Sequence, residues 1–326
     1  AQQSNVDVEG QGEILKIAAV PQAGLRDVTF DRADGSIRSE TYRRLPTPYA
    51  IERTGARERM VALTFDDGPD PVWTPRILSI LERYHAPASF FIVGENGVEN
   101  RDLLRRIVAD GSEIGNHSYT HPNMAEEAGA GIGLELNATQ RLIEAATGRA
   151  TRLFRAPYFG DAEPTTADEL GPALEAQRRG YAVVGLHVDP GDWKQPGAAA
   201  IVQRTLAQVR SASPERSANI VLLHDGGGDR AQTVAALPAI IEGLRAEGYQ
   251  LVTVGQLAGL RTDQVMPRVR GMDLAAVRTD VAFFMGLATV LAGLNWTFFF
   301  AIALGVARSL VMAVLAVTAP RQKAPP

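Results

Sequence analysis

Short apolar runs alternate along the middle of the chain with longer segments in which apolar residues recur at helical spacing. Residues 60–65 form an apolar run that predicts a buried strand, and residues 74–84 carry apolar side chains on one helical face. The same patterns predict helices over 101–109, 135–147 and 238–247 and strands over 88–93, 181–188, 220–223 and 251–254. Strands that alternate with helices indicate an α/β fold with a mostly parallel sheet or barrel, whose reactive residues gather at the carboxyl ends of the strands.

Residues 1–57 do not follow this repeat, and we expect them to form an N-terminal extension that is a separate piece. Residues 14–20 indicate a strand, whereas Pro46 and Pro48 oppose regular structure because proline lacks a backbone donor and restrains the residue before it. The piece is too short to bury much core by itself. The parts that follow it are a domain over 58–262 and a linker over 263–280.

The C-terminal part of the chain is strongly apolar. Residues 281–307 contain no charged residue, and this stretch is longer than the roughly 20 residues that a membrane-spanning helix needs. A second apolar stretch follows Arg308, so one tilted helix and two spans broken near Asn295 are both open interpretations. A buried soluble helix is less expected, because few polar residues are available for a wet face. We therefore predict a transmembrane segment of one or two helices over 281–320 and a polar tail over 321–326.

Charge and cysteine content narrow the possible partners. The net charge is −4 and the sequence pI is about 5.8, so the chain lacks the basic surface that nucleic-acid binding requires. Cysteine is absent, which excludes disulfides and thiolate zinc sites and leaves His, Asp and Glu as metal ligands. The chain begins at Ala1 without a signal-peptide pattern, which leaves a mature chain and a fragment both open.

Two adjacent carboxylates, Asp66 and Asp67, follow the predicted strand over 60–65. Because Gly68 and Pro69 come next, an ordinary turn explains this segment about as well as a functional site does. A strand that ends in two carboxylates nevertheless allows one of them to bind a cation while the other accepts a proton from water.

Three histidines are candidates for a reactive centre. His117 and His121 lie four residues apart, a spacing that places two ligands on one side of a helical turn, although a pair of surface histidines is the alternative. His224 follows the apolar run over 220–223 and precedes a glycine-rich loop, where it is either a core-edge residue or a proton donor. Asp189 is its candidate partner, because a neighbouring negative charge orients an imidazole and raises its pKa.

Other side chains complete this set. Arg155 is suited to hold a carboxylate in a fixed geometry, and Tyr158 and Trp193 offer flat faces to a sugar ring or simply pack in the protein. We expect the remaining histidines, His85 and His187, to be structural. Together the candidates supply three ligands of N/O type, a general base and a general acid, which is the inventory of a mononuclear metal hydrolase.

Five segments carry a resemblance to a known family, and they cover 64–69, 117–121, 155–158, 189–193 and 222–224. They resemble the five motifs of the NodB-type polysaccharide deacetylases, which are carbohydrate esterase family four, and the resemblance covers roughly residues 58–260. It implies a distorted (β/α)7-type barrel that removes acetyl groups from N-acetylglucosamine glycans by hydrolysis of a linear amide. It also implies one divalent metal, most often zinc, with cobalt or other divalent ions as alternatives.

The resemblance assigns a role to each matching residue. Asp66 resembles the catalytic base, Arg155 the residue that holds this base, and His224 the general acid. Asp189 resembles the aspartate that supports the acid, and Asp192 is a second aspartate of the same motif. The residues that resemble metal ligands are Asp67, His117 and His121. The residues that resemble substrate-binding groups are Tyr158, through its backbone N–H, Trp193 and Leu222.

The flanking segments resemble parts of larger bacterial proteins. Residues 12–49 are similar to the end of a family-eighteen glycoside hydrolase-like module, and the chain after residue 266 resembles the junction to a membrane glycosyltransferase of the cellulose or chitin synthase type. We therefore expect a fragment with a fused or associated glycosyltransferase, anchored to a membrane with the deacetylase domain outside the cytoplasm, on the periplasmic or extracellular face.

The expected substrate is a β-linked N-acetylglucosamine glycan of the chitooligosaccharide type. Peptidoglycan is an alternative substrate for the same chemistry, and a non-catalytic glycan-binding module that guides a synthase is an alternative of another class. A purely structural membrane anchor would leave the five segments unexplained.

Overall fold

The computed structural model describes residues 6–127, 129–213 and 215–318. The chain divides into two units, Ala1–Leu274 and Ala275–Pro326. The predicted polar tail over 321–326, and the last two residues of the predicted span, lie outside the described residues.

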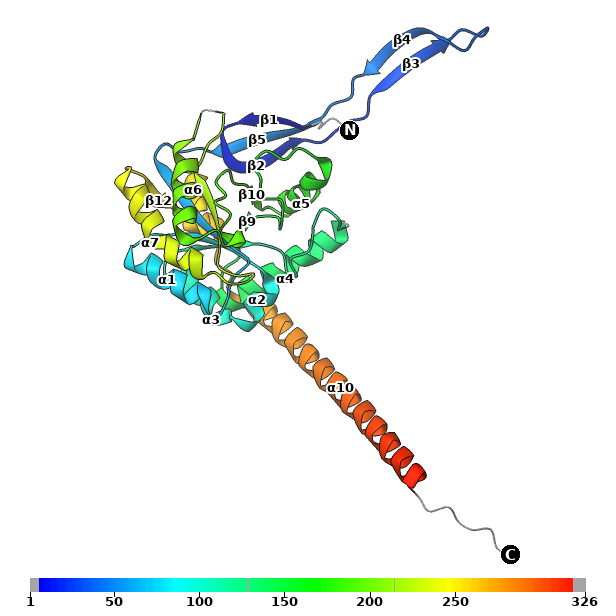
Figure 1. Cartoon of the computed structure of the whole chain (residues 1–326). Helices are drawn as coiled ribbons and strands as arrows, with labels where there is room; N and C mark the ends of the chain where they lie inside the picture. Colours follow the sequence, from blue (N-terminus) through cyan, green and yellow to red (C-terminus); the bar gives the residue numbers. More distant parts are fainter. Residues whose placement is uncertain (1–5, 128, 214, 319–326) are drawn as a thin grey trace, which may run out of the picture. The chain divides into compact units, whose positions relative to one another are not determined.

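A ten-stranded sheet, counted over the described residues, forms the framework of the first unit (Figure 1). Its strands are, in spatial order, β1 (Val6–Gly10), β5 (Tyr49–Gly55), β2 (Gly12–Ala19), β10 (Ala182–Val184), β9 (Leu153–Phe154), β8 (Glu113–Asn116), β7 (Ser89–Ile92), β6 (Met60–Asp66) and β11 (Ile220–His224), with β12 (Gln250–Val252) also paired to β6. Every pair from β10 to β11 is parallel. Val188, beyond the end of β10, forms a parallel bridge with Val221 of β11. The parallel strands therefore curve into a distorted (β/α)7 barrel. The alternating pattern predicts a mostly parallel sheet or barrel, and the family resemblance implies this particular form.

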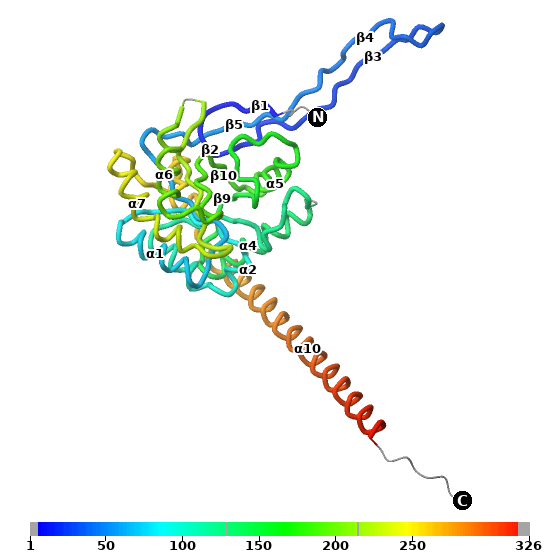
Figure 2. Tube along the Cα trace, in the orientation of Figure 1, coloured from blue at the N-terminus to red at the C-terminus, as the bar shows by residue number. Residues whose placement is uncertain are grey.

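Helices surround the parallel strands and cover their apolar side chains. They are α1 (Trp73–Arg83), α2 (Gly94–Glu99), α3 (Arg101–Ala109), α4 (Gly129–Thr147), α5 (Ala167–Arg178), α6 (Ala198–Arg210), α7 (Ala231–Ala246), α8 (Val254–Leu257) and α9 (Thr262–Val265). Helix α7 packs beside α1 and α6, as the trace in Figure 2 shows. The core between helices and strands includes Phe65 and Phe90, whose stacked rings are fully buried. Burial of these apolar faces is the main source of stability for such a fold.

The N-terminal segment is part of the main sheet, so the prediction of a separate piece over 1–57 is wrong. Strand β2 pairs antiparallel with β10, where Leu15 faces Val183 and Ile14 faces Val184, and it buries its apolar side chains there. Only β3 (Leu25–Phe30) and β4 (Ile37–Arg44) stand apart, as an exposed two-stranded sheet. The segment adds strands to the sheet because its apolar residues find partners far away in sequence.

The described part of the second unit lies within α10 (Gly271–Thr318). This element is one continuous helix of 48 residues. It shows no break near Asn295, so the alternative of two spans is not what the structure contains. It begins inside the predicted linker over 263–280, which also contains the last three residues of α9. By length and composition alone it qualifies as a membrane span, with a mean hydropathy of 2.3 over its most apolar window.

Candidate active site

All ten predicted site residues line one cleft of about 580 Å³. The cleft lies at the carboxyl ends of the parallel strands, as the repeat of strands and helices predicts. Asp66 ends β6 and His224 ends β11, and the two residues face each other in the strand register. His117 follows β8 directly and Arg155 follows β9. Apolar runs therefore carry the polar residues to one edge of the barrel.

Three potential metal ligands gather on one side of this cleft. One ligand atom each from Asp67, His117 and His121 lies within 4.8 Å of the others. Asp67 Oδ1 is 3.0 Å from His121 Nε2 and 3.6 Å from His117 Nε2. His117 Nδ1 is 2.8 Å from the carbonyl oxygen of Arg155, a contact that fixes the ring and leaves Nε2 for the cluster. Two imidazole nitrogens and one carboxylate oxygen form a donor set that suits a divalent cation such as zinc.

The backbone around these ligands adopts an uncommon conformation. Asp67, Ser118 and His121 have φ values of 72°, 67° and 57°, in the left-handed region. Residues 117–121 form a bend rather than the helical turn that the spacing of four predicts, so that geometric reason is wrong although both imidazoles reach the cluster. The Oγ of Ser118 accepts a hydrogen bond from the backbone N–H of His121 at 3.1 Å and stabilises the bend. Strain of this kind concentrates at functional sites.

The charges of the cluster favour an ionised carboxylate. Burial tends to raise the pKa of Asp67, but hydrogen bonds from His117 and His121 and the charges of His117 and His224 hold that pKa well below its usual range. An ionised carboxylate is the form that binds a metal.

Asp66 is held by a buried arginine. Arg155 is 1% exposed, and its Nη1 donates to Asp66 Oδ1 at 2.8 Å and to Thr64 Oγ1 at 2.9 Å. The guanidinium also lies 4.2 Å from the ring centroid of Phe91. Burial lowers the pKa of Arg155, while the charge and hydrogen bond of Asp66 oppose that effect. An arginine remains charged in a protein, so this contact is a buried ion pair that fixes one oxygen of the Asp66 carboxylate.

His224 is oriented by Asp192 and not by Asp189, which corrects the predicted pairing. His224 Nδ1 lies 2.7 Å from Asp192 Oδ1, and the backbone N–H of His224 donates to Asp192 Oδ2 at 2.9 Å. Thr233 Oγ1 donates to Asp192 Oδ2 at 2.7 Å. Burial tends to lower the pKa of His224, but Asp192 and the charges of Asp66 and Asp67 outweigh burial and raise it above its ordinary value.

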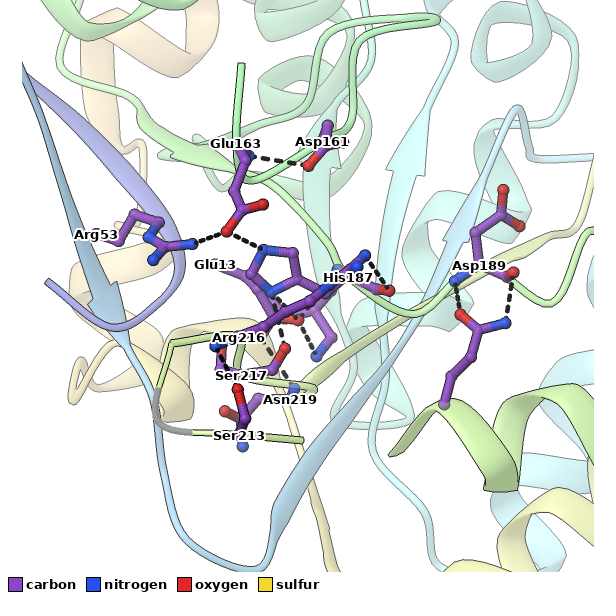
Figure 3. Close-up of polar contacts among 12 residues, drawn as sticks. Glu13, Arg53, Asp161, Glu163, His187, Asp189, Ser213, Arg216, Ser217 and Asn219 are labelled. Atoms are coloured by element: carbon purple, nitrogen blue, oxygen red, sulfur yellow. Dashed lines mark hydrogen bonds and ion pairs between the residues drawn. The ribbon is translucent and has the colours of Figure 1, made fainter. Parts of the chain in front are cut away.

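Asp189 lines the cleft, but its hydrogen bonds are with its own loop and with helix α6. Its Oδ1 accepts from the backbone N–H of Gly191 at 2.7 Å, and its backbone makes two hydrogen bonds with the amide of Gln208 (Figure 3). The turn that follows Asp189 places Gly191 at a φ of 69° and brings Asp192 beneath His224, in the 3-10 turn η1 (Asp192–Lys194). The sequence offers two aspartates in one short motif, and only the shape of this turn selects between them.

Two aromatic side chains stand exposed at the rim. Tyr158 is 71% exposed and its ring centroid lies 4.9 Å from that of His121. Trp193 is 49% exposed, with the Nζ of Lys194 at 4.6 Å from its ring centroid. Leu222 adds an apolar patch to the lining. Flat rings beside an apolar patch are suited to contact the faces of a sugar.

Arg230 is a lining residue that sequence reasoning missed. Its Nε donates to the carbonyl oxygen of Gly226 at 2.7 Å and its Nη2 to that of Gly227 at 2.9 Å. A Cβ on Gly226 would lie 2.3 Å from the carbonyl oxygen of Asp67, so this loop must be glycine to pack against the metal-ligand turn. The signal available in the sequence was an arginine two residues after three consecutive glycines. His85 and His187, expected to be structural, do not line the cleft.

Comparison with known proteins agrees with this geometry. The sequence model of the family described as polysaccharide deacetylase matches residues 53–171. The chain is 37% identical over 216 residues to a peptidoglycan-N-acetylglucosamine deacetylase of Bacillus cereus, covering 65% of this chain and 94% of that protein. It is 36% identical over 219 residues to a chitooligosaccharide deacetylase of Sinorhizobium fredii, covering 63% and 95%.

A solved structure leads to the same assignment. The crystal structure of a peptidoglycan N-acetylglucosamine deacetylase in complex with a naphthyl-substituted N-hydroxybenzamide superposes with a TM-score of 0.56 and 30% sequence identity, covering 66% of this chain and 92% of that one. The similarity in sequence and in fold covers nearly the whole length of these relatives. The chain therefore belongs to the polysaccharide deacetylase family, the NodB-type enzymes of carbohydrate esterase family four.

Proposed function

We propose that this polysaccharide deacetylase is a metal-dependent hydrolase that removes N-acetyl groups from a β-linked N-acetylglucosamine glycan of the chitooligosaccharide type and releases acetate. The observation that carries the proposal is the convergence of three groups in one cleft. The first group is the set of three potential metal ligands that includes Asp67. The second is the Asp66 carboxylate, held by Arg155, and the third is the His224 imidazole, held by Asp192. Relatives named for chitooligosaccharide support the substrate class.

The proposed metal ligands are Asp67, His117 and His121. Their donor set favours zinc, and cobalt or another divalent ion would also fit. A divalent ion bound there supplies a Lewis acid that polarises the acetamide carbonyl and makes a nearby water more acidic.

Two side chains of the protein accept and donate the protons that the hydrolysis requires. Asp66 accepts a proton from the attacking water, because Arg155 occupies Oδ1 and leaves Oδ2 free of this ion pair. The water oxygen bonds to the acetyl carbon, and the backbone N–H of Tyr158 helps to stabilise the oxyanion. His224 donates its Nε2 proton to the departing nitrogen as the C–N bond breaks, because Asp192 already occupies Nδ1. The products are acetate and the free sugar amine.

Release of acetate tests this proposal. The zinc-loaded chain is incubated with an N-acetylated chitooligosaccharide and, separately, with peptidoglycan, with and without a chelator. We expect metal-dependent release from the chitooligosaccharide that zinc restores after chelation. Release from peptidoglycan alone would favour the alternative substrate. Binding of the oligosaccharide without release under metal-replete conditions would instead make the chain a glycan-binding module that guides a synthase.

We further propose that α10 anchors the enzyme in a membrane, with the deacetylase unit on the periplasmic or extracellular face. The support is the uncharged stretch over 281–307 within a continuous helix. A fused or associated glycosyltransferase is the partner that the flanking resemblance suggests. Truncation after residue 270 should convert the protein from membrane-bound to soluble in a fractionation at alkaline pH. Recovery of the full chain in the soluble fraction would contradict the anchor.

A further inference from the structure

Glu13 is a buried carboxylate outside the cleft, and backbone groups surround it. It lies on β2 and is 1% exposed. Its Oε1 accepts from the backbone N–H groups of His187 at 3.1 Å and Ile220 at 3.3 Å, and its Oε2 accepts from that of Asn219 at 2.9 Å (Figure 3). Its own carbonyl oxygen accepts from the backbone N–H of Gly185 at 2.7 Å. One side chain of the N-terminal strand therefore holds two distant segments.

Each of these segments ends in a residue of the proton-donating pair. The chain from Gly185 and His187 continues into the loop that carries Asp192, and the chain from Asn219 continues through β11 to His224. Between the ends, the backbone N–H of Leu222 donates to the carbonyl oxygen of Val188 at 2.9 Å. A buried carboxylate joins the segments at each end, Glu13 at one and Asp192 at the other.

Residues beside Glu13 also connect the same two segments through hydrogen bonds. His187 Nδ1 lies 2.7 Å from the carbonyl oxygen of Ser217, and Arg216 Nη2 donates to the carbonyl oxygen of His187 at 3.4 Å. A cavity of about 210 Å³ is lined in part by His187, Arg216 and Ser217. This cavity borders His187, whose backbone N–H donates to Glu13, whereas Glu13 itself does not line it.

We propose that Glu13 is a positioning residue of the deacetylase, through which the N-terminal strand sets the placement of Asp192 against His224. This inference rests on the proposed role of His224 as the acid that protonates the departing amine. It extends the functional unit to β2, which lies before the region matched by the family model at residues 53–171. The ligands Asp67, His117 and His121 come from other turns of the barrel, and no contact between them and Glu13 is recorded among the described residues.

A change of leaving group separates positioning from general stability. An acetamide must have its nitrogen protonated as it departs, whereas the phenolate of 4-nitrophenyl acetate departs without a proton donor. Both substrates need the base and the metal ligands. A residue that acts through His224 therefore changes the ratio of the two rates, and a residue that only stabilises the fold does not.

The experiment compares E13Q with wild type and H224A as zinc-loaded full chains in detergent. We expect E13Q to lower kcat for an N-acetylated chitooligosaccharide by about tenfold or more, which is part of the 10²–10⁴-fold that a general acid contributes. In E13Q, the turnover of 4-nitrophenyl acetate and the affinity for zinc should each stay within about twofold to threefold of the wild-type values, because neither depends on the general acid. An unchanged ratio in E13Q, with both rates lowered equally or neither lowered, overturns the proposal.

Glu113 provides the matched control. It is also 1% exposed, and its carboxylate accepts from the backbone N–H of Gly255 at 2.9 Å and from Thr253 Oγ1 at 2.8 Å. It contacts neither the Asp192 loop nor β11 through any recorded hydrogen bond of the described residues. E113Q should therefore preserve the ratio of the two rates even if it lowers stability. A fall in this ratio in E113Q equal to that in E13Q counts against a specific role for Glu13.

A double-mutant cycle gives a second measurement that does not need the ester. If Glu13 acts through His224, E13Q lowers glycan turnover in the wild-type background and adds little in the H224A background. Additive effects overturn the proposal. If E13Q does not fold, E13D replaces it, because the shorter side chain keeps the charge and loses reach. Full activity of H224A itself would refute the acid assignment and the proposed function, a result distinct from full activity of E13Q alone.

Discussion

Asp192 contacts His224 twice, once at the imidazole Nδ1 at 2.7 Å and once at the backbone N–H at 2.9 Å. Because both carboxylate oxygens are used, neither the position nor the rotation of the ring is free. The second ring nitrogen, Nε2, is therefore the one that remains for a proton transfer in the cleft. Asp192, a buried carboxylate, therefore sets the orientation of the His224 imidazole and raises its pKa.

Replacement of Asp192 by asparagine should move the alkaline limb of the pH–rate profile to lower pH. Burial tends to lower the pKa of His224, and the hydrogen bond and charge of Asp192 are the largest of the effects that raise it. Removing the charge lowers the pKa, so the protonated acid is lost at a lower pH than in wild type. The profile of kcat for chitooligosaccharide deacetylation measures the shift. D189N, which does not contact His224, should leave the limb in place, and an equal shift in D189N would contradict the pairing.

Asp66 and Asp67 should separate turnover from metal binding. D66N keeps the ligands and loses the base, so we expect normal zinc content and turnover lowered by about 10²–10⁴-fold. D67A and H117A lose a ligand, and metal content and activity should fall together. Zinc analysis of purified protein, paired with acetate release, checks both outcomes. Full activity in D66N would overturn the assignment of the base.

Loss of Arg155 should destabilise the fold as well as the site. The guanidinium and Asp66 are both buried, and removal of one partner of such a pair costs about 3–5 kcal/mol because the other charge is left uncompensated. R155M should therefore lower the thermal midpoint, and D66N added to R155M should recover part of the loss. The recovery is measured by thermal unfolding of the four proteins. No recovery in the double variant would mean that the pair is not the source of the loss.

The stability of the protein should depend on pH through Glu13. Burial raises the pKa of Glu13 to about 7 from its ordinary 4.5, more than its backbone N–H donors lower it. The folded state then binds more protons than the unfolded state between these pKa values, so stability falls as the pH rises from about 4.5 to about 7. E13Q lacks this group. The thermal midpoint of wild type relative to E13Q should therefore decline across this window, and a constant difference would contradict the shift.

The convergence of the site was predictable because apolar runs mark strands and polar residues follow them. Asp66 and His224 each end a run of this kind, and the barrel brings the ends of its strands together. The choice between Asp189 and Asp192 was not predictable. It depends on a turn through Gly191 at a φ of 69°, which the sequence permits but does not impose.

The helices that the sequence did not predict are those without a strong pattern of apolar residues. Helix α6 begins with three alanines, and α5 contains Pro172, so neither shows a clear apolar periodicity. Strand β2 was expected, but its pairing with β10 was not, because the partner lies more than 160 residues further along the chain. Long-range pairing is decided by the packing of the whole unit and leaves no short-range signal.

The left-handed backbone at Asp67, Ser118 and His121 has a consequence for protein engineering. Grafting the two histidines and the aspartate onto a regular helix or strand of another scaffold would not reproduce this centre, since regular elements do not supply those dihedral angles. A transplant must carry the bends together with the glycines that Asp67 packs against.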